Sequence, residues 1–255
     1  ARDVARHPLE IYRFLKAQGV RHIQFNPVVE RPPSAPQVDL GLHFAVPPEL
    51  RLHAIPEPAR VTEHTVDPQA YADFLIAILN EWVRQDVGTV HVMNFEWALA
   101  AWCQLPASVC LFSPRCGKAA IVEHDGDVYS CDHYMYPEYR LGNLKTDDPA
   151  ALLASPAQQA FGAAKELTLP TLCQQCDYRF ACHGECPKNR FATAPNGEPG
   201  LNYLCPGYKK YFRHLTPYMN AMAQLVSHKQ PAALIMQAFS GPLLVPLDTC
   251  WSGLK

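Results

Sequence analysis

The apolar positions near the N-terminus change from helical to strand-like spacing. A helix is predicted over residues 8–19, because Pro8 suits the first turn of a helix and Gly19 suits its end. Its apolar face consists of Ile11, Tyr12, Phe14 and Leu15. Residues 20–25 follow as a short predicted strand. A helix followed by a strand is one step of a β/α barrel or of an open α/β sheet.

A second and more strongly amphipathic helix is predicted downstream. It begins at Asp67 and Pro68 and ends at Gly88. Its apolar residues recur at helical spacing and are Tyr71, Phe74, Leu75, Ile78, Leu79 and Trp82. A short strand over residues 89–93 and an aromatic-rich helix over residues 95–102 follow.

The remaining pattern is less regular. Residues 27–58 are rich in proline and lack periodicity, which indicates either a functional loop or a surface insertion. Asp125-Gly126 between two short apolar runs predicts a tight β-hairpin. Residues 173–186 are too dense in cysteine to predict a regular element. Further helices are predicted over residues 149–154, 156–165, 206–225 and 232–239.

Composition narrows the class of protein. A chain of 255 residues that is 48% hydrophobic can bury a sizeable core in one or two domains. Its 22 basic and 24 acidic residues give a net charge of −2, which offers no electrostatic reason to expect nucleic acid or a membrane surface as partner. No secretory signal is visible, and the sequence starts at Ala1 in what reads as the middle of a domain. We therefore expect a fragment.

Nine of the ten cysteines lie between Cys103 and Cys205. Disulfide scaffolds are usually short and secreted, whereas clustered cysteines without a secretory signal favour metal sites in a reducing cytoplasm. Cys103 and Cys250 fit no ligand pattern and are predicted to be small buried hydrophobic residues.

The other eight cysteines are spaced as two sets of four, and they are Cys110, Cys116, Cys131, Cys173, Cys176, Cys182, Cys186 and Cys205. Two tetrahedral zinc ions or two 4Fe-4S clusters would each use such sets. The run from Cys173 to Cys186-Pro187 resembles a loosened bacterial ferredoxin run, in which the cysteine before the proline binds the other cluster. Only His183 lies inside the run, so a mixed Cys/His zinc site has little support. Zinc bound by four cysteines remains open.

The ferredoxin analogy assigns members to each set. The first set is Cys110, Cys116, Cys131 and Cys186. The second set is Cys173, Cys176, Cys182 and Cys205.

Several motifs resemble one known family. They are Cys110-x5-Cys116, Cys131-Asp132-His133-Tyr134, Leu141-Gly142-Asn143, and the run from Cys173 to Cys186-Pro187-Lys188 followed by Cys205. These motifs look like the SPASM domain of anaerobic sulfatase-maturating enzymes. Residues 7–10 and 24–27 are similar to the last helix and strand of that family's radical SAM barrel.

The resemblance implies an α/β fold with two parts. Residues 1–105 would form the C-terminal remnant of a partial (β/α)6 radical SAM barrel with connecting helices. Residues 106–255 would form an irregular, cysteine-rich SPASM domain with a β-hairpin, two auxiliary 4Fe-4S clusters and C-terminal helices.

The resemblance also implies an activity, which is anaerobic sulfatase maturation. In that family, a radical SAM oxidoreductase converts a Cys or Ser of a sulfatase polypeptide to Cα-formylglycine. A third 4Fe-4S cluster, held by a Cys-x3-Cys-x2-Cys loop, cleaves S-adenosylmethionine, and an external protein such as ferredoxin or flavodoxin exchanges electrons. This sequence has no such loop, so the chain as given is expected to be inactive by itself.

Two other functions remain open. One is a SPASM-type radical SAM enzyme that modifies a different peptide. The other is a zinc-knotted binding module without enzymatic activity.

Three polar residues are candidates for roles beside the cysteines. Asp132 corresponds to the family's proposed proton acceptor, and a modestly raised pKa would suit that role. An ordinary loop aspartate that caps a turn is the alternative. Gln24 and Asn26 lie on the predicted last barrel strand, whose end would face S-adenosylmethionine in a complete barrel.

Overall fold

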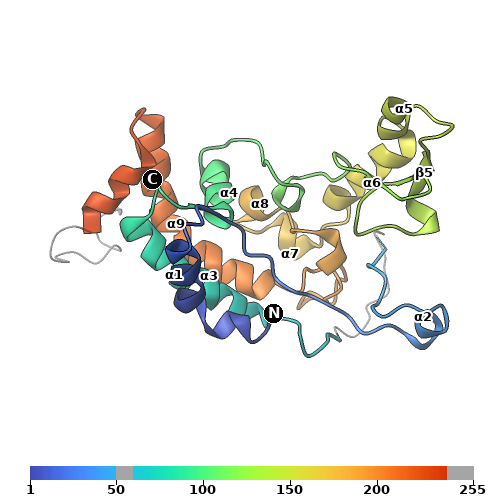
Figure 1. Ribbon diagram of the computed structural model, residues 1–255, viewed down its shortest axis with the longest axis horizontal. Helices are drawn as coiled ribbons and strands as arrows, with labels where there is room; N and C mark the ends of the chain where they lie inside the picture. Colours follow the sequence, from blue (N-terminus) through green and yellow to red (C-terminus); the bar gives the residue numbers. More distant parts are fainter. Residues whose placement is uncertain (50–59, 240–255) are drawn as a thin grey trace. The chain divides into compact units, whose positions relative to one another are not determined.

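The computed structural model describes residues 1–49 and 60–239 (Figure 1). The chain groups into two compact units, and we describe each by itself. The first unit contains Ala1–Val28, His64–Pro106 and the chain from Pro206 onward, and the second contains Val29–Glu63 and Ala107–Cys205. The helix after Cys205 thus groups with the first unit, whereas we had expected it with the cysteine-rich part. The correspondence of these units to domains of a larger enzyme stays a prediction.

Helices dominate the first unit. They are α1 (Pro8–Ala17), α3 (Pro68–Gln85), α4 (Met93–Trp102), α9 (Cys205–Ser227) and the 3-10 helices η1 (Val4–Arg6) and η5 (Ala232–Phe239). Each predicted helix in this part of the chain is confirmed. The two predicted strands are also present, as the short β1 (His22–Ile23) and β2 (His91–Val92). They pair in parallel, with His22 opposite His91.

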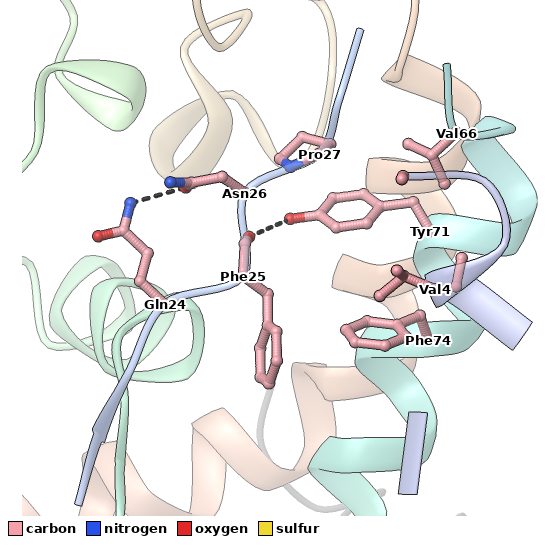
Figure 2. Close-up of a pocket in the computed structure, with 10 residues that line it drawn as sticks. Val4, Gln24, Phe25, Asn26, Pro27, Val66, Tyr71 and Phe74 are labelled. Atoms are coloured by element: carbon pink, nitrogen blue, oxygen red, sulfur yellow. Dashed lines mark hydrogen bonds between the residues drawn. The ribbon is translucent and has the colours of Figure 1, made fainter. Parts of the chain in front are cut away.

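Helix α3 forms the centre of the first unit's core. The Asp67 side chain caps its N-terminus by accepting hydrogen bonds from the backbone N–H groups of Gln69 and Ala70, at 2.8 and 3.0 Å. Its buried face consists of Tyr71, Ala72, Phe74, Leu75, Ile78, Leu79, Trp82 and Val83. The Tyr71 hydroxyl donates to the Phe25 carbonyl at 2.8 Å, which ties the helix to the segment after β1 (Figure 2).

The second unit combines a small sheet with short helices. Its elements are α2 (Ala35–Asp39), η2 (Cys110–Phe112), β3 (Ile121–Val122), β4 (Asp127–Tyr129), η3 (Pro137–Tyr139), β5 (Arg140–Asn143), α5 (Pro149–Leu153), α6 (Pro156–Leu167), α7 (Thr171–Gln174), α8 (Arg179–Cys182) and η4 (Pro187–Asn189). The three strands form one antiparallel sheet in the order β3-β4-β5. The predicted hairpin is confirmed as β3 and β4.

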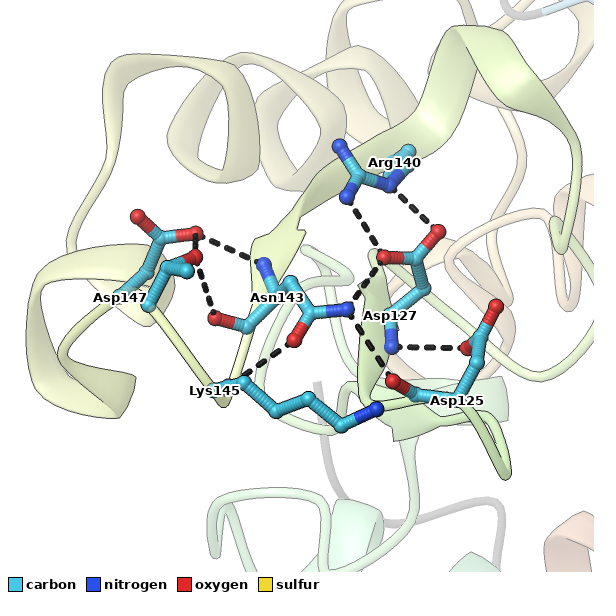
Figure 3. A network of polar contacts seen from close by, with 7 residues as sticks. Asp125, Asp127, Arg140, Asn143, Lys145 and Asp147 are labelled. Carbon is cyan, nitrogen blue, oxygen red and sulfur yellow. Dashed lines mark hydrogen bonds and ion pairs between the residues drawn. The ribbon is translucent and has the colours of Figure 1, made fainter.

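Polar contacts fix the hairpin turn to β5 (Figure 3). Gly126 has a φ of +95°, and a Cβ there would lie 2.9 Å from Oδ1 of Asn143. The Arg140 guanidinium donates twice to the Asp127 carboxylate, both at 2.6 Å. Asn143 Nδ2 donates to the Asp125 carbonyl and to Asp127 Oδ1. The sheet is therefore ordered by side chains at its turn as well as by its ladder.

The structure corrects several sequence-based expectations. Residues 173–186 contain two one-turn helices, α7 and α8, because two to five residues between cysteines are enough to close a single turn. Strand β5 was not predicted. The proline-rich segment contains α2, and its residues 50–58 lie outside the described part. Cys103 is half-buried rather than buried, and Cys250 lies outside the described residues.

Within residues 1–49 and 60–239, no helix is both long enough and apolar enough to cross a membrane.

Candidate metal centre

Three thiols of the first set are electrostatic neighbours of the fourth, Cys116. Burial raises the pKa of Cys116, and the nearby thiol of Cys110 raises it further. The Cys116 thiol in turn raises the pKa of both Cys131 and Cys186. The other three members of the first set therefore share Cys116 as an electrostatic neighbour, although 76 positions separate Cys110 from Cys186 in the sequence. Their role as ligands stays a prediction.

Helix α6 holds two of the first set's loops in place. The Cys116 N–H donates to the Gly162 carbonyl at 3.2 Å, and a Cβ on Gly162 would lie 2.7 Å from the Cys116 oxygen. Gln158 Nε2 donates to the carbonyls of Gly117 and Ser130, at 3.1 and 3.2 Å. These two residues adjoin Cys116 and Cys131, so one amide group ties both loops to the helix.

The side-chain oxygen of Gln158, Oε1, is an unusual buried atom. It accepts no hydrogen bond from any described residue. Because Nε2 already donates twice, turning the amide over would not satisfy it. An unsatisfied buried acceptor costs about 1–3 kcal/mol, so this atom marks a polar site beside the first set.

Two thiols of the second set are electrostatic neighbours of Cys182. Burial raises the pKa of the Cys182 thiol to about 12, and the thiols of Cys173 and Cys205 raise it as well. Cys176 lies two residues after the end of α7, and its N–H donates to the Cys173 carbonyl at 3.3 Å. The one-turn helices α7 and α8 thus contain Cys173 and Cys182, and Cys176 lies between them.

The thiol pKa values have a consequence for metal binding. Burial raises the pKa of Cys131 to about 12, as it does for Cys182. Thiolates, not thiols, bind metals, so loading must displace protons from both sets. Within the described residues, no three His, Cys, Asp or Glu side chains already form a group that would hold a single metal ion.

Two buried cations lie beside the thiols, and the sequence analysis named neither. Lys165 is fully buried, and its Nζ donates to the carbonyls of Cys110 and Leu111, both at 2.7 Å. Arg190 is 4% exposed and interacts electrostatically with thiols of both sets. Buried positive charge next to thiolates fits a group whose ligand shell is negative.

One pattern in the sequence could have identified Gln158 and Lys165 as buried polar residues. The buried positions of α6 recur at helical spacing and are Gln158, Phe161, Gly162 and Lys165. A glutamine and a lysine on the inward face of an amphipathic helix indicate polar partners in the interior. No comparable signal identifies Arg190, because its contacts depend on tertiary structure.

Asp132 lies next to the first set. The Cys131 thiol donates to its Oδ1 at 3.1 Å, and its side chain is 66% exposed. Burial alone would raise the pKa of Asp132, but the hydrogen bond from Cys131 and the charge of His133 lower it below its usual value. A modestly raised pKa would suit a proton acceptor, whereas the pKa of Asp132 in the chain by itself is lowered, and the role of Asp132 stays a prediction. Tyr134, two residues on, is fully buried against Tyr139 and Phe161.

Gln24 and Asn26 belong to the first unit. Gln24 Nε2 donates to Asn26 Oδ1 at 2.7 Å, and both line a pocket of about 220 Å³ (Figure 2). Phe25, Tyr71 and Phe74 make its apolar wall. A pocket of this size is smaller than typical ligand sites of roughly 300–1,000 Å³, so it would admit only part of a cofactor.

Comparison with known proteins agrees with this picture. Residues 110–177 match the model of SPASM, an iron–sulfur cluster-binding domain. A serine-type anaerobic sulfatase-maturating enzyme of Bacteroides thetaiotaomicron is 42% identical, over 92% of this chain and 54% of that protein. A serine-type enzyme of the same description from Klebsiella pneumoniae is 30% identical, over 82% of this chain and 45% of that protein. The chain spans about half the length of these curated relatives.

A solved structure has the same fold. It is the enzyme anSMEcpe with bound AdoMet and a Cp18Cys peptide, and it matches 88% of this chain and 56% of that chain with a TM-score of 0.68. The two sequences are 21% identical, so this likeness concerns the mixed α/β fold.

Proposed function

Since this chain is a homologue of the anaerobic sulfatase-maturating enzymes, we propose that it supplies the auxiliary-cluster part of an enzyme that oxidises a sulfatase side chain to Cα-formylglycine. The observation that carries the proposal is the match of residues 110–177, which include five of the eight cysteines, to the SPASM iron–sulfur domain, and the electrostatic neighbours of Cys116 and Cys182 support it. The clustered free thiols also support a cytoplasmic location.

We assign one 4Fe-4S cluster to each set of cysteines. Cys110, Cys116, Cys131 and Cys186 would hold the first, and Cys173, Cys176, Cys182 and Cys205 the second. Such clusters, when bound, accept and release single electrons. An external ferredoxin or flavodoxin is the proposed exchange partner, and S-adenosylmethionine with a third cluster belongs to the same proposed enzyme.

The substrate residue is proposed to be a serine, because the relatives at 42% and 30% identity are both described as serine-type. Converting a –CH2OH group to an aldehyde removes two electrons and two protons. One proton leaves from the hydroxyl group and needs an acceptor at the site.

Asp132 is the proposed acceptor of that proton. Its place in the chain supports the role, since it follows Cys131 directly and its side chain is exposed enough to meet a substrate. Gln24 and Asn26 are the proposed contacts on the S-adenosylmethionine side, supported by the pocket that they line.

A chimeric enzyme tests the proposal. This chain would replace the matched segment of the Bacteroides thetaiotaomicron relative, and the chimera would be expressed anaerobically with a sulfatase carrying Ser at the modified position. We expect mass spectrometry to find formylglycine in that sulfatase. A chimera with intact iron content that leaves the serine unmodified contradicts the proposal.

The same chimera tests Asp132. Asp132→Asn keeps the shape of the side chain but cannot accept the proton, and we expect formylglycine yield to fall roughly 100-fold or more, as for loss of a general base. Asp125→Asn, in the hairpin turn, is the control and should leave the yield unchanged. Unchanged yield in Asp132→Asn with intact iron content would remove the role.

A further inference from the structure

Arg190 is a buried cation that makes no ion pair with a carboxylate in the described residues. All three of its nitrogens donate to backbone carbonyls. Nε donates to Gly184 at 3.1 Å, Nη1 to Lys165 at 2.6 Å and Nη2 to His183 at 2.8 Å. These bonds engage each of its nitrogens but do not neutralise its charge.

The backbone is shaped to receive this guanidinium. Gly184 has a φ of +73°, and a Cβ there would lie 2.5 Å from Nη2 of Arg190. Gly184 sits between Cys182 of the second set and Cys186 of the first. The segment that joins the two sets therefore wraps around the Arg190 charge.

The negative partners of Arg190 are the cysteines. Its electrostatic neighbours are Cys173 and Cys182 of the second set and Cys116 and Cys186 of the first. An arginine does not lose its proton inside a protein, and an uncompensated buried charge is strongly unfavourable. Thiolates that carry clusters would supply the compensation from both sides.

Lys165 differs from Arg190 in its neighbours. Its charge interacts with Cys116 and Cys186, which are both members of the first set, and with the carboxyl group of Glu185. Glu185 is itself buried and accepts from the side-chain amides of Asn189 and Asn202, at 3.1 and 2.6 Å. Two buried cations and one buried carboxyl group thus accompany the eight cysteines.

We propose that Arg190 is a shared positive charge that raises the reduction potentials of both clusters, and that Lys165 raises the potential of the first cluster alone. This inference rests on the proposed function, in that both sets must hold clusters. Reduction adds one electron to a cluster and makes it more negative. A fixed cation nearby stabilises the reduced form more than the oxidised form, and burial protects that interaction from screening by salt. Both residues are positioning residues that act on the clusters through their charge.

The test is a redox titration of the anaerobically reconstituted full chain. Dithionite supplies one electron to each cluster, electron paramagnetic resonance follows the reduced clusters, and iron and sulfide analysis records loading. Arg190→Gln removes the charge, Arg190→Lys keeps it, and Lys165→Met removes the other charge from a buried position.

The expected shifts in reduction potential depend on the charge of the side chain at each position. Arg190→Gln should shift both one-electron steps to more negative potentials, Arg190→Lys should leave both close to wild type, and Lys165→Met should shift one step only. A purely structural role for Arg190 would make Arg190→Lys as disruptive as Arg190→Gln, because both lose the three-nitrogen fork.

Three results would overturn the inference. They are unchanged potentials in loaded Arg190→Gln, equal shifts in Arg190→Gln and Arg190→Lys, and a Lys165→Met variant that moves both steps or neither. If Arg190→Gln binds no clusters, the reduction potentials of Arg190→Lys and Lys165→Met decide whether the inference holds. Wild-type chain that loads no cluster overturns the proposed function, whereas loaded wild type with unmoved potentials overturns this inference alone.

Discussion

The interiors of the two units are built from different kinds of residue. The first unit buries an almost wholly apolar core around α3 and α9, including Ile78, Leu79, Trp82, Leu215 and Met219. The second unit also buries apolar side chains, such as Phe161, Phe191 and Leu204, but together with them it buries side chains that carry a charge or an amide, namely Gln158, Lys165, Glu185, Asn189, Arg190 and Asn202.

This difference indicates two sources of stability. Burial of apolar area stabilises the first unit by about 25 cal/mol per Å² and needs no cofactor. In the second unit, buried charges would destabilise the fold unless opposite charge meets them. Cluster binding is therefore expected to contribute folding free energy there, as metals do in small metal-dependent domains.

Removal of iron is expected to have the largest effect, and it should affect the interior of the second unit but not that of the first. Chelated chain should lose hydrogen-exchange protection across α6, α7 and α8, whereas α3 should keep its slow amides. Mass spectrometry of hydrogen exchange before and after chelation measures this, and reconstitution with iron and sulfide should restore protection. Equal protection of α6 with and without iron would show that the second unit does not depend on clusters.

A cavity in the apolar core should destabilise the first unit and leave iron binding by the second unit unchanged. Leu79 is fully buried in α3, and Leu79→Ala should lower the free energy of unfolding by about 2–5 kcal/mol while iron content stays at wild type. Urea unfolding followed by tryptophan fluorescence measures the loss. Leu105→Ala is the matched control, since Leu105 is 59% exposed and its truncation should cost little. A loss of iron in Leu79→Ala would contradict the separation of the two interiors.

The smallest effect concerns an exposed charge pair in the second unit. Two hydrogen bonds from Arg140 and one from Asn143 lower the pKa of Asp127 to about 2. Since the folded pKa lies below the ordinary value of about 3.9, the stabilisation is complete above that value and is lost as pH falls through about 2. Carboxyl carbon NMR of Asp127 should show this midpoint. In Arg140→Gln the midpoint should move back towards the ordinary value, and an unmoved midpoint would contradict the assigned cause.

Local sequence signals predicted much of the molecule. The helical spacing from Tyr71 to Trp82 predicted α3, and Asp67 predicted its cap, because both depend on neighbours in the chain. Asp125-Gly126 predicted the hairpin for the same reason. The spacing of the cysteines predicted two sets of four ligands, and that assignment stays a prediction, although the electrostatic neighbours of Cys182 include Cys173 and Cys205 of its own set.

Features that depend on long-range contacts were not predictable. Arg190 donates to a carbonyl 25 positions away, and no spacing rule reports such a contact. Strand β5 contains Gly142 and Asn143, which are typical of loops, and it forms because β4 offers a ladder. The sequence likewise does not reveal the hydrogen bond from Cys131 to Asp132, which helps to lower the pKa of Asp132.

The metal and sulfide content of anaerobically reconstituted chain tests the central claim most directly. Two 4Fe-4S clusters require about eight iron atoms and about eight acid-labile sulfides per chain, in a brown protein. We predict that composition, with iron and sulfide lost in parallel when Cys116 or Cys182 is replaced by Ala. A colourless protein with two zinc ions and no sulfide would contradict the account.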